Sequence, residues 1–257
     1  MTRLVSAVMF CFAVLPSSVR AAGLAHDANF IVLAPNQPAA DAALAKANEH
    51  RRAVAVEWLG EELPPGVGQT SLHVEFNDRE DRGLTWPIDA PGRSLHKVWI
   101  VSSPENALES TLRHEVLHVV LATQFPGKLP AWADEGAASQ CDDAQRKSTR
   151  ARTVRWYAQS GNWPRLDVLL QKPSISPADQ ADYSTASSLT EYLLTRGDRR
   201  TFLKFAVDGK ARGWDSALQT HYRISDVSAL QTQWQAWVEG GSRAPALTAL
   251  PRLPWSH

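Results

Sequence analysis

The sequence contains few cysteines, with only Cys11 and Cys141 among its 257 residues. Cys11 lies in an N-terminal segment that we expect to be removed, so Cys141 would remain alone. This count excludes an intramolecular disulfide framework of the kind that stabilises many small exported domains. The chain is long enough to bury a sizeable core, and we expect its stability to come from that core.

The sequence also lacks an excess of charge of either sign, because 27 basic residues balance 27 acidic ones. This balance argues against a nucleic-acid partner and against an anionic membrane surface. One basic cluster is present, and we expect it to be the solvated face of a helix. It comprises Arg146, Lys147, Arg150, Arg152 and Arg155, with Asp142 and Asp143 just upstream.

Long apolar runs are scarce, and the single one covers Leu4–Leu15, between the basic Arg3 and a small-residue cleavage site ending at Ala21. This arrangement predicts a secretory signal peptide at residues 1–21 and export to the periplasm or the medium. Twelve apolar residues are too few to span a bilayer, so no membrane anchor is expected after cleavage. A lipoprotein site at Cys11 is disfavoured because the residue before it is large.

Hydrophobic patterning predicts an α+β fold, with a small α/β N-terminal half and a mainly α-helical C-terminal half. We expect a mixed sheet within residues 22–125, a helical subdomain at 126–240 and a flexible tail at 241–257. The expected strands are 29–33, 71–76, 83–86 and 95–101. The expected helices are 38–59, 104 to a stop at 125–127, 131–138, 142–160, 182–196, 199–207, 214–222 and 226–239.

Tryptophan is abundant, with ten residues dispersed along the chain. Tryptophan platforms can bind sugars, but this dispersion favours core anchoring for most of them. The tryptophans that we expect in the core include Trp58, Trp99, Trp156, Trp234 and Trp237.

The expected helix from Pro104 has clear signals at both ends. Ser103 is a good N-cap, Pro104 suits the first helical position, and Phe125-Pro126-Gly127 ends the helix. Within it, His114 and His118 are four residues apart and therefore point the same way, with apolar side chains on the opposite face. One face can pack against a core while the other holds a metal ion.

Glu115 directly follows the first histidine and completes the pattern H-E-x-x-H. On a helix this pattern is typical of two zinc ligands, His114 and His118, with the glutamate as a general base. A catalytic zinc site takes a third protein ligand and keeps one position for water. The best candidate is Glu135, in the stretch Trp132-Ala133-Asp134-Glu135-Gly136 after a tight turn. A chance match of the pattern is the alternative to a metal site.

The two motifs resemble those of the gluzincin metallopeptidases, and within them the peptidase MA-like family of mostly bacterial secreted proteins. The family's pair H-E-x-x-H and W-x-x-E-G corresponds to His114–His118 and Trp132–Gly136. The resemblance covers roughly residues 28–240 and is specific at these two motifs. It extends more loosely to 182–186, 191–198, 214–218 and 234–237.

The resemblance implies a zincin-like fold and one Zn²⁺ per chain, held by His114, His118 and Glu135. It implies that Glu115 takes a proton from water and passes it to the leaving amine of a peptide. Tyr183 is similar to a family tyrosine that donates to the oxyanion, although its hydroxyl can equally be structural.

By the same resemblance, residues 83–86 would form the sheet edge along which an extended peptide lies. Ser139 departs from the pattern, because thermolysin-like enzymes carry an acidic partner for a ligand histidine one turn past the third ligand. The partners of the ligand histidines therefore stay unassigned. His73 and His96 are more simply explained as strand-face residues than as ligands.

The sequence thus predicts an exported zinc metallopeptidase that acts on peptides or proteins. Endopeptidase action is favoured because no motif for binding an N-terminal amine is evident upstream. Two other classes stay open: a metal-binding or peptide-binding envelope protein without turnover, and a structural module that binds no metal. The presence of Glu115 counts against the first of these.

Overall fold

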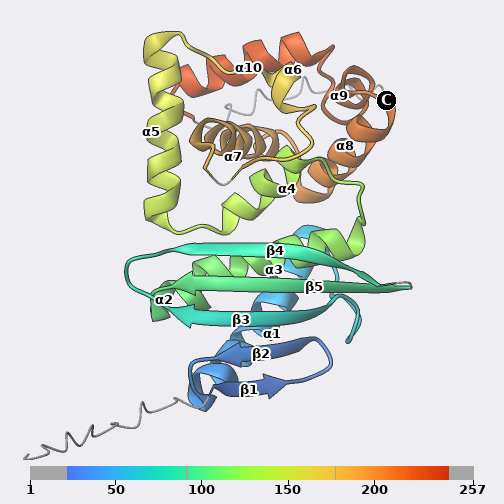
Figure 1. Ribbon diagram of the computed structural model, residues 1–257. Helices are drawn as coiled ribbons and strands as arrows, with labels where there is room; N and C mark the ends of the chain where they lie inside the picture. Colours follow the sequence, from blue (N-terminus) through green and yellow to red (C-terminus); the bar gives the residue numbers. More distant parts are fainter. Residues whose placement is uncertain (1–21, 91, 177, 243–257) are drawn as a thin grey trace, which may run out of the picture.

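The computed structural model describes residues 22–90, 92–176 and 178–242. The predicted signal peptide lies outside the described residues, as does the predicted tail beyond residue 242. The chain folds as α+β, with a mixed sheet and its helices followed by a mainly helical C-terminal half (Figure 1), which confirms the predicted fold class. Among the described residues, no helix is long and apolar enough to cross a membrane.

Five strands form the sheet, in the spatial order β1-β2-β3-β5-β4. They are β1 (Gly23–His26), β2 (Phe30–Ala34), β3 (Gln69–Phe76), β4 (Arg82–Ala90) and β5 (Arg93–Ser102). The three central strands run parallel, whereas β1 and β4 pair antiparallel at the two edges. The four predicted strands are confirmed, and β4 occupies the predicted edge. The sequence does not predict β1, since four residues are too few to show a period.

Helices α1 (Gln37–Leu59), α2 (Pro104–Leu108) and α3 (Ser110–Gln124) pack against one face of the sheet (Figure 1). The side chain of Asn36 caps α1 by accepting from the Ala39 N–H at 2.9 Å. Gly60 ends α1 in the left-handed region, with φ of 87°. The side chains buried between helices and sheet include Phe30, Val32, Leu72, Val98, Ile100, Ala43, Val54, Leu112 and Val116.

The helix expected from Pro104 to the stop at 125–127 is interrupted, so that prediction is wrong at Glu109. This residue has φ of −106° and ψ of −97°, and it separates α2 from α3. Contacts with α1 compensate for the break: Nε2 of His50 bonds the Leu108 carbonyl at 2.9 Å, and Lys46 pairs with Glu109 at 3.0 Å. Such tertiary contacts are invisible to local helix signals.

The C-terminal half is helical, as predicted, with helix ends displaced by a few residues. Its elements are α4 (Ala131–Ala138), the 3-10 turn η1 (Ser139–Cys141), α5 (Ala144–Ser160), α6 (Leu166–Leu169), α7 (Gln180–Leu194), α8 (Arg199–Arg212), α9 (Trp214–Tyr222) and α10 (Val227–Glu239). Aspartate side chains cap the N-termini of four of these helices. Helix α8 runs one turn longer than expected, and α6 is too short to predict.

The tryptophans divide between core and surface. Trp58, Trp234 and Trp237 are buried, as predicted. The predicted core positions are wrong for Trp99 and Trp156, which are 38% and 52% exposed. Trp99 lies on the outer face of β5, where side chains alternate between the two faces of the sheet.

Candidate metal centre

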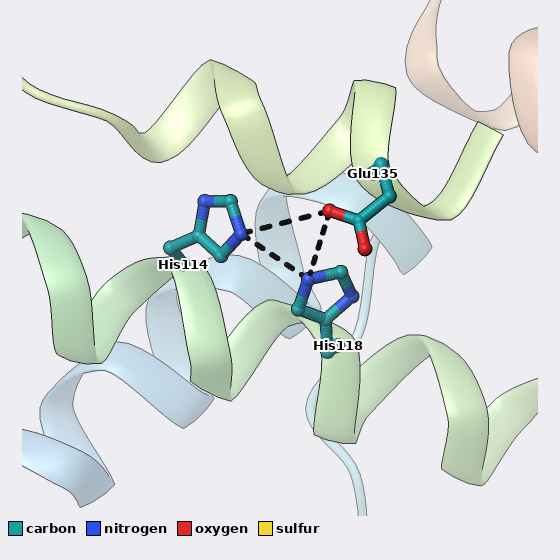
Figure 2. Close-up of side chains that lie close together, drawn as sticks. All are labelled: His114, His118 and Glu135. Carbon is teal, nitrogen blue, oxygen red and sulfur yellow. Dashed lines mark hydrogen bonds and ion pairs between the residues drawn. The ribbon is translucent and has the colours of Figure 1, made fainter. Parts of the chain in front are cut away.

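Helix α3 directs His114 and His118 toward Glu135 of α4 (Figure 2). The Nε2 atoms of the two imidazoles are 3.2 Å apart. Oε2 of Glu135 lies 4.0 Å from Nε2 of His114 and 3.7 Å from Nε2 of His118. The structure thus brings together the three residues that the sequence predicts as ligands, and this group could hold one metal ion.

When both imidazoles are neutral, the three converging atoms all carry lone pairs, so a cation between them is favourable. Each imidazole donates from Nδ1 to a carboxylate, so its neutral form presents a lone pair at Nε2, and these two lone pairs face each other. Oε2 of Glu135 is buried and has no hydrogen-bond partner among the described residues. Tetrahedral zinc places its ligand atoms roughly 3.3 Å apart, which is near the separations seen here. The group is therefore consistent with a zincin-like site.

Helix α4 holds Glu135 through the residues on either side of it. Trp132 is fully buried and packs edge-on against Phe202 of α8, with ring centroids 5.7 Å apart. Gly136 faces α7, where an added Cβ would lie 2.1 Å from Oγ1 of Thr190. The stretch W-x-x-E-G therefore combines a core anchor, the carboxylate and the space for a close helix approach.

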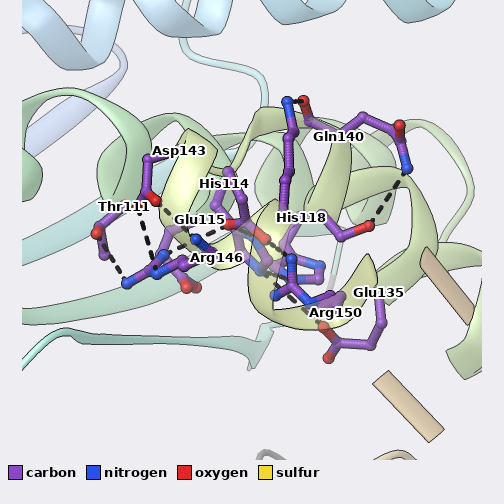
Figure 3. A network of polar contacts seen from close by, with 12 residues as sticks. Thr111, His114, Glu115, His118, Glu135, Gln140, Asp143, Arg146 and Arg150 are labelled. Atoms are coloured by element: carbon purple, nitrogen blue, oxygen red, sulfur yellow. Dashed lines mark hydrogen bonds and ion pairs between the residues drawn. The ribbon is translucent and has the colours of Figure 1, made fainter. Parts of the chain in front are cut away.

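His114 is oriented by a carboxylate that the sequence does not assign. Its Nδ1 donates to Oδ1 of Asp142 at 2.9 Å, and the Asp142 side chain is 0% exposed. Arg146 and Arg150 of α5 pair with the same carboxylate, as part of the polar network in Figure 3. Burial raises the pKa of Asp142, but the hydrogen bond from His114 and the charge of Arg150 outweigh it and hold that pKa well below its usual range.

His118 is oriented by Asp134, whose Oδ2 accepts from the imidazole Nδ1 at 2.9 Å. The Asp134 side chain is 35% exposed, so this flank of the site is open. Burial lowers the pKa of His118, but the carboxylates of Asp134 and Glu135 outweigh it and hold the pKa well above its ordinary value. Without a metal ion, the imidazole therefore retains a proton among these carboxylates.

The predicted solvated face of α5 is wrong for two of its basic residues. Arg146 and Arg150 turn toward the site, with side chains 22% and 13% exposed, because the buried Asp142 attracts them. Lys147, Arg152 and Arg155 are exposed, as predicted. The two aspartates just before α5 are the sequence signal for this pairing.

Ser139 does not serve as a partner of a ligand histidine. Its hydroxyl donates to the Gly136 carbonyl at 2.7 Å and so helps to form the turn η1 after α4. The acidic partner comes three residues later, from Asp142, because η1 carries the chain back toward α3. The departure at Ser139 is thus compensated further along the chain.

Glu115 points from α3 toward the edge strand β4. Oγ1 of Thr85 donates to Oε2 of Glu115 at 2.6 Å. Gly83 lies beside the same carboxylate, and a Cβ added there would be 2.3 Å from Oε1. Strand β4 therefore fixes one carboxylate oxygen and leaves room for the other, two features that sequence reasoning did not find.

A cavity of about 190 Å³ opens beside these groups, between β4, α3, α4 and α7. All five predicted site residues line it: His114, Glu115, His118, Glu135 and Tyr183. Burial and the nearby Glu135 carboxylate raise the pKa of Tyr183, so its hydroxyl stays protonated and can donate a hydrogen bond.

The two strand histidines lie outside the group that could hold a metal ion. His73 is on the outer face of the sheet, where it stacks on Trp99 with ring centroids 5.7 Å apart. His96 is buried on the inner face, with Nε2 3.0 Å from the hydroxyls of Ser94 and Thr123. Both are strand-face residues, as predicted, although His96 also lines the cavity.

Comparison of the chain with protein-family models finds no matching family, and comparison with curated proteins finds no match. The geometry of the candidate metal centre is thus the feature that informs on function.

Proposed function

We propose that the protein is an exported gluzincin-type zinc peptidase, similar to the peptidase MA-like family, that hydrolyses peptide bonds. The observation that carries this proposal is the position of Glu115, which is buried beside His114, His118 and Glu135 but is not one of the converging group. A structural zinc site closes its coordination with four protein ligands and needs no adjacent carboxylate. Three ligands plus a free carboxylate suit the activation of water.

The residues present fit Zn²⁺, since His114, His118 and Glu135 offer two imidazole nitrogens and one carboxylate oxygen. When bound in such a set, the ion supplies Lewis acidity, which lowers the pKa of water to about 7 and polarises a carbonyl. Asp142 and Asp134 hold the imidazoles in the tautomer that presents Nε2 to the ion and raise their basicity.

Glu115 is the general base in this proposal. The Thr85 hydroxyl bonds its Oε2, which fixes the carboxylate and leaves Oε1, beside Gly83, to accept a proton from water. The same oxygen then passes the proton to the leaving amine as the peptide bond breaks. Thr85 positions this group without touching the reacting atoms.

Tyr183 is the donor to the oxyanion. Its raised pKa keeps the hydroxyl protonated, and the residue lines the same cavity as Glu115 and Glu135. The Arg150 guanidinium lies 5.7 Å from the centroid of the Tyr183 ring, which helps to hold the ring in place.

The open edge of β4 binds the main chain of the substrate. The β4–β5 register is unbroken, so main-chain groups alternate between pointing toward β5 and pointing away from it. Pro87 has no N–H to give to β5, which places it in the set that points away. Gly83 and Thr85 belong to the same alternate set, so their N–H and C=O groups face an incoming extended peptide.

Replacing Glu115 tests the proposal. Glu115→Gln keeps size and helix propensity but removes the proton acceptor, so hydrolysis of a mixed peptide library should fall about 10²- to 10⁴-fold. Zinc content, measured by elemental analysis after mild dialysis, should stay near one ion per chain. Glu49→Gln, at an exposed position on α1, is the matched control and should change neither quantity.

Glu135→Gln tests whether Glu135 acts as a metal ligand, in contrast to Glu115, which acts as a general base. It weakens one of the three converging groups, so zinc content and hydrolysis should decline together. A wild type that folds but retains no zinc would contradict the metal site. Zinc retention without hydrolysis in the wild type would instead indicate a metal-binding protein without turnover.

A further inference from the structure

The face of the sheet opposite α1 and α3 carries large apolar side chains that remain exposed. In Figure 1 these helices lie behind the sheet, and this outer face is toward the viewer. Its exposed apolar side chains are Leu24, Ile31, Leu33, Leu84, Trp86, Ile88 and Trp99, each between 38% and 52% exposed. Clustered apolar exposure of this kind is typical of surfaces that bind a ligand or another polypeptide.

Four of these apolar side chains, together with His73 of β3, form a row across the whole sheet. The registers place Leu24 beside Leu33, Leu33 beside His73, His73 beside Trp99 and Trp99 beside Leu84. The rings of His73 and Trp99 stack with an interplanar angle of 12°. The row ends at Leu84 on β4, which is the edge strand and has no further neighbour in the sheet.

Trp86 is two residues beyond Leu84 on β4 and points to the same outer face, where it is 39% exposed. Thr85 lies between them and points the opposite way, to Glu115. Strand β4 therefore directs Thr85 toward the candidate metal centre and Leu84 and Trp86 onto the outer face. This alternation is a property of the strand that borders the cavity.

An extended peptide paired with β4 would continue this alternation. Its side chains would point alternately into the cavity and onto the outer face, where they would lie directly beside Leu84 and Trp86. The row that starts at Leu24 would then extend by one strand. The occupant that fits this edge is thus a peptide segment with apolar side chains at every second position.

We infer that Leu84 and Trp86 select substrates with aliphatic or aromatic side chains at two positions that are two residues apart. This inference rests on the proposed function, because it assigns the alternate side chains of the peptide bound at the β4 edge. Cross-strand apolar pairs of this kind correspond to a preference of about twofold to fivefold in kcat/KM for an apolar over a polar side chain at each position. The substrate class is therefore extended segments with alternating apolar residues, as found in unfolded chains and β-strands.

The test uses zinc-loaded protein and internally quenched peptides that differ at one position at a time, with Phe, Leu, Ser or Asp. Wild-type protein should prefer Phe and Leu by about twofold to fivefold in kcat/KM at two positions spaced by two. Leu84→Ser should remove the preference at one of these positions, and Trp86→Ser at the other.

Leu33→Ser is the matched control. Leu33 belongs to the same apolar row and is 39% exposed, but it lies on β2, three strands away from β4. It should leave every preference unchanged. Preferences that are absent in the wild type, or that survive in Leu84→Ser and Trp86→Ser, would overturn the inference.

A binding measurement keeps this inference separate from the proposed function. Fluorescence anisotropy of peptides with the same sequences but a single fluorophore, on zinc-loaded Glu115→Gln, reports selection without hydrolysis. Selective binding with no hydrolysis by the wild type would refute the peptidase proposal and support the inference. Hydrolysis by the wild type without any preference between the peptides would support the peptidase proposal and refute the inference.

Discussion

The two imidazoles of the candidate metal centre come from one turn of α3, yet their two flanks differ. On the α5 flank, His114 bonds the fully buried Asp142, which Arg146 and Arg150 also contact. On the α4 flank, His118 bonds a carboxylate whose side chain is 35% exposed. One flank is enclosed and the other is open.

The enclosed flank connects several elements. Arg146 pairs with Asp81, just before β4, at 2.6 Å, and Asp81 also accepts from Ser102 at 2.7 Å and from Thr111 at 2.9 Å. The open flank instead borders the cavity, which Asp134 helps to line. The α5 flank therefore fixes the geometry of the site, whereas the α4 flank gives access to it.

The largest expected effect comes from breaking the enclosed flank. Asp142→Asn keeps the shape of the side chain but leaves the largely buried Arg150 without its carboxylate, whereas Arg146 keeps its pair with Asp81. Loss of one partner of a buried ion pair costs about 3–5 kcal/mol, so the free energy of unfolding of the metal-free protein should fall by that amount. Zinc affinity should also fall, by about 10- to 100-fold. Chemical denaturation and a competition titration measure the two quantities.

Asp134→Asn is the matched change on the open flank. Its carboxylate is partly solvated and has His118 as its one side-chain hydrogen-bond or ion-pair partner among the described residues, so the free energy of unfolding should change by no more than about 1 kcal/mol. Zinc affinity should still decline, because the imidazole loses its orienting group. An equal stability loss in both variants would contradict the contrast between the flanks.

A smaller effect is expected where β4 meets Glu115. Gly83→Ala would place a methyl group 2.3 Å from Oε1 of Glu115, so the carboxylate must move. Crowding of this kind costs about 1–3 kcal/mol of stability. Zinc content should persist while peptide hydrolysis declines, because the base moves and the ligands do not.

Gly240→Ala adds the same methyl group at the end of α10, where its nearest neighbour outside the adjacent residues is 3.3 Å away. It should leave hydrolysis unchanged. Full activity in Gly83→Ala would show that the Glu115 carboxylate can move without loss of hydrolysis. Gly83 would then not be required at the site.

The converging residues were predictable because their signals are local. The pair His114 and His118 needs only helical periodicity, and Glu135 follows from a short motif on the next helix. Their orientation was not predictable, since Asp142 reaches His114 only through the turn η1 and the packing of α5. A second carboxylate, Asp134, sits within the recognised motif, but no periodicity shows that it contacts His118.

The fold shows the same limit. Elements longer than about two helical turns or five strand residues were predicted in type, whereas β1 and α6 were too short to show a period. The apolar neighbours of Trp99 in the sequence predict a core position. Its exposure depends on which face of the sheet the helices cover, and that is decided by tertiary packing.

The smallest expected effect concerns the proton on the open flank. The pKa of His118 in the folded, metal-free protein is well above the unfolded value of about 6.5. Protonation therefore stabilises the metal-free fold fully below that unfolded value, and this contribution is lost as the pH rises through the raised pKa. A metal ion at Nε2 must displace the same proton.

Zinc affinity should accordingly rise with pH, by about tenfold per pH unit for one displaced proton, until the raised pKa of His118 is passed. Asp134→Asn removes one of the carboxylates that raise this pKa, so the affinity of that variant should level off at a lower pH. Competition against a chelator of known pH dependence, followed from about pH 6 upward until each curve levels off, measures both curves. Identical curves for the two proteins would show that Asp134 does not set the protonation of His118. The two carboxylates, Asp134 and Asp142, would then differ only in how deeply they are buried.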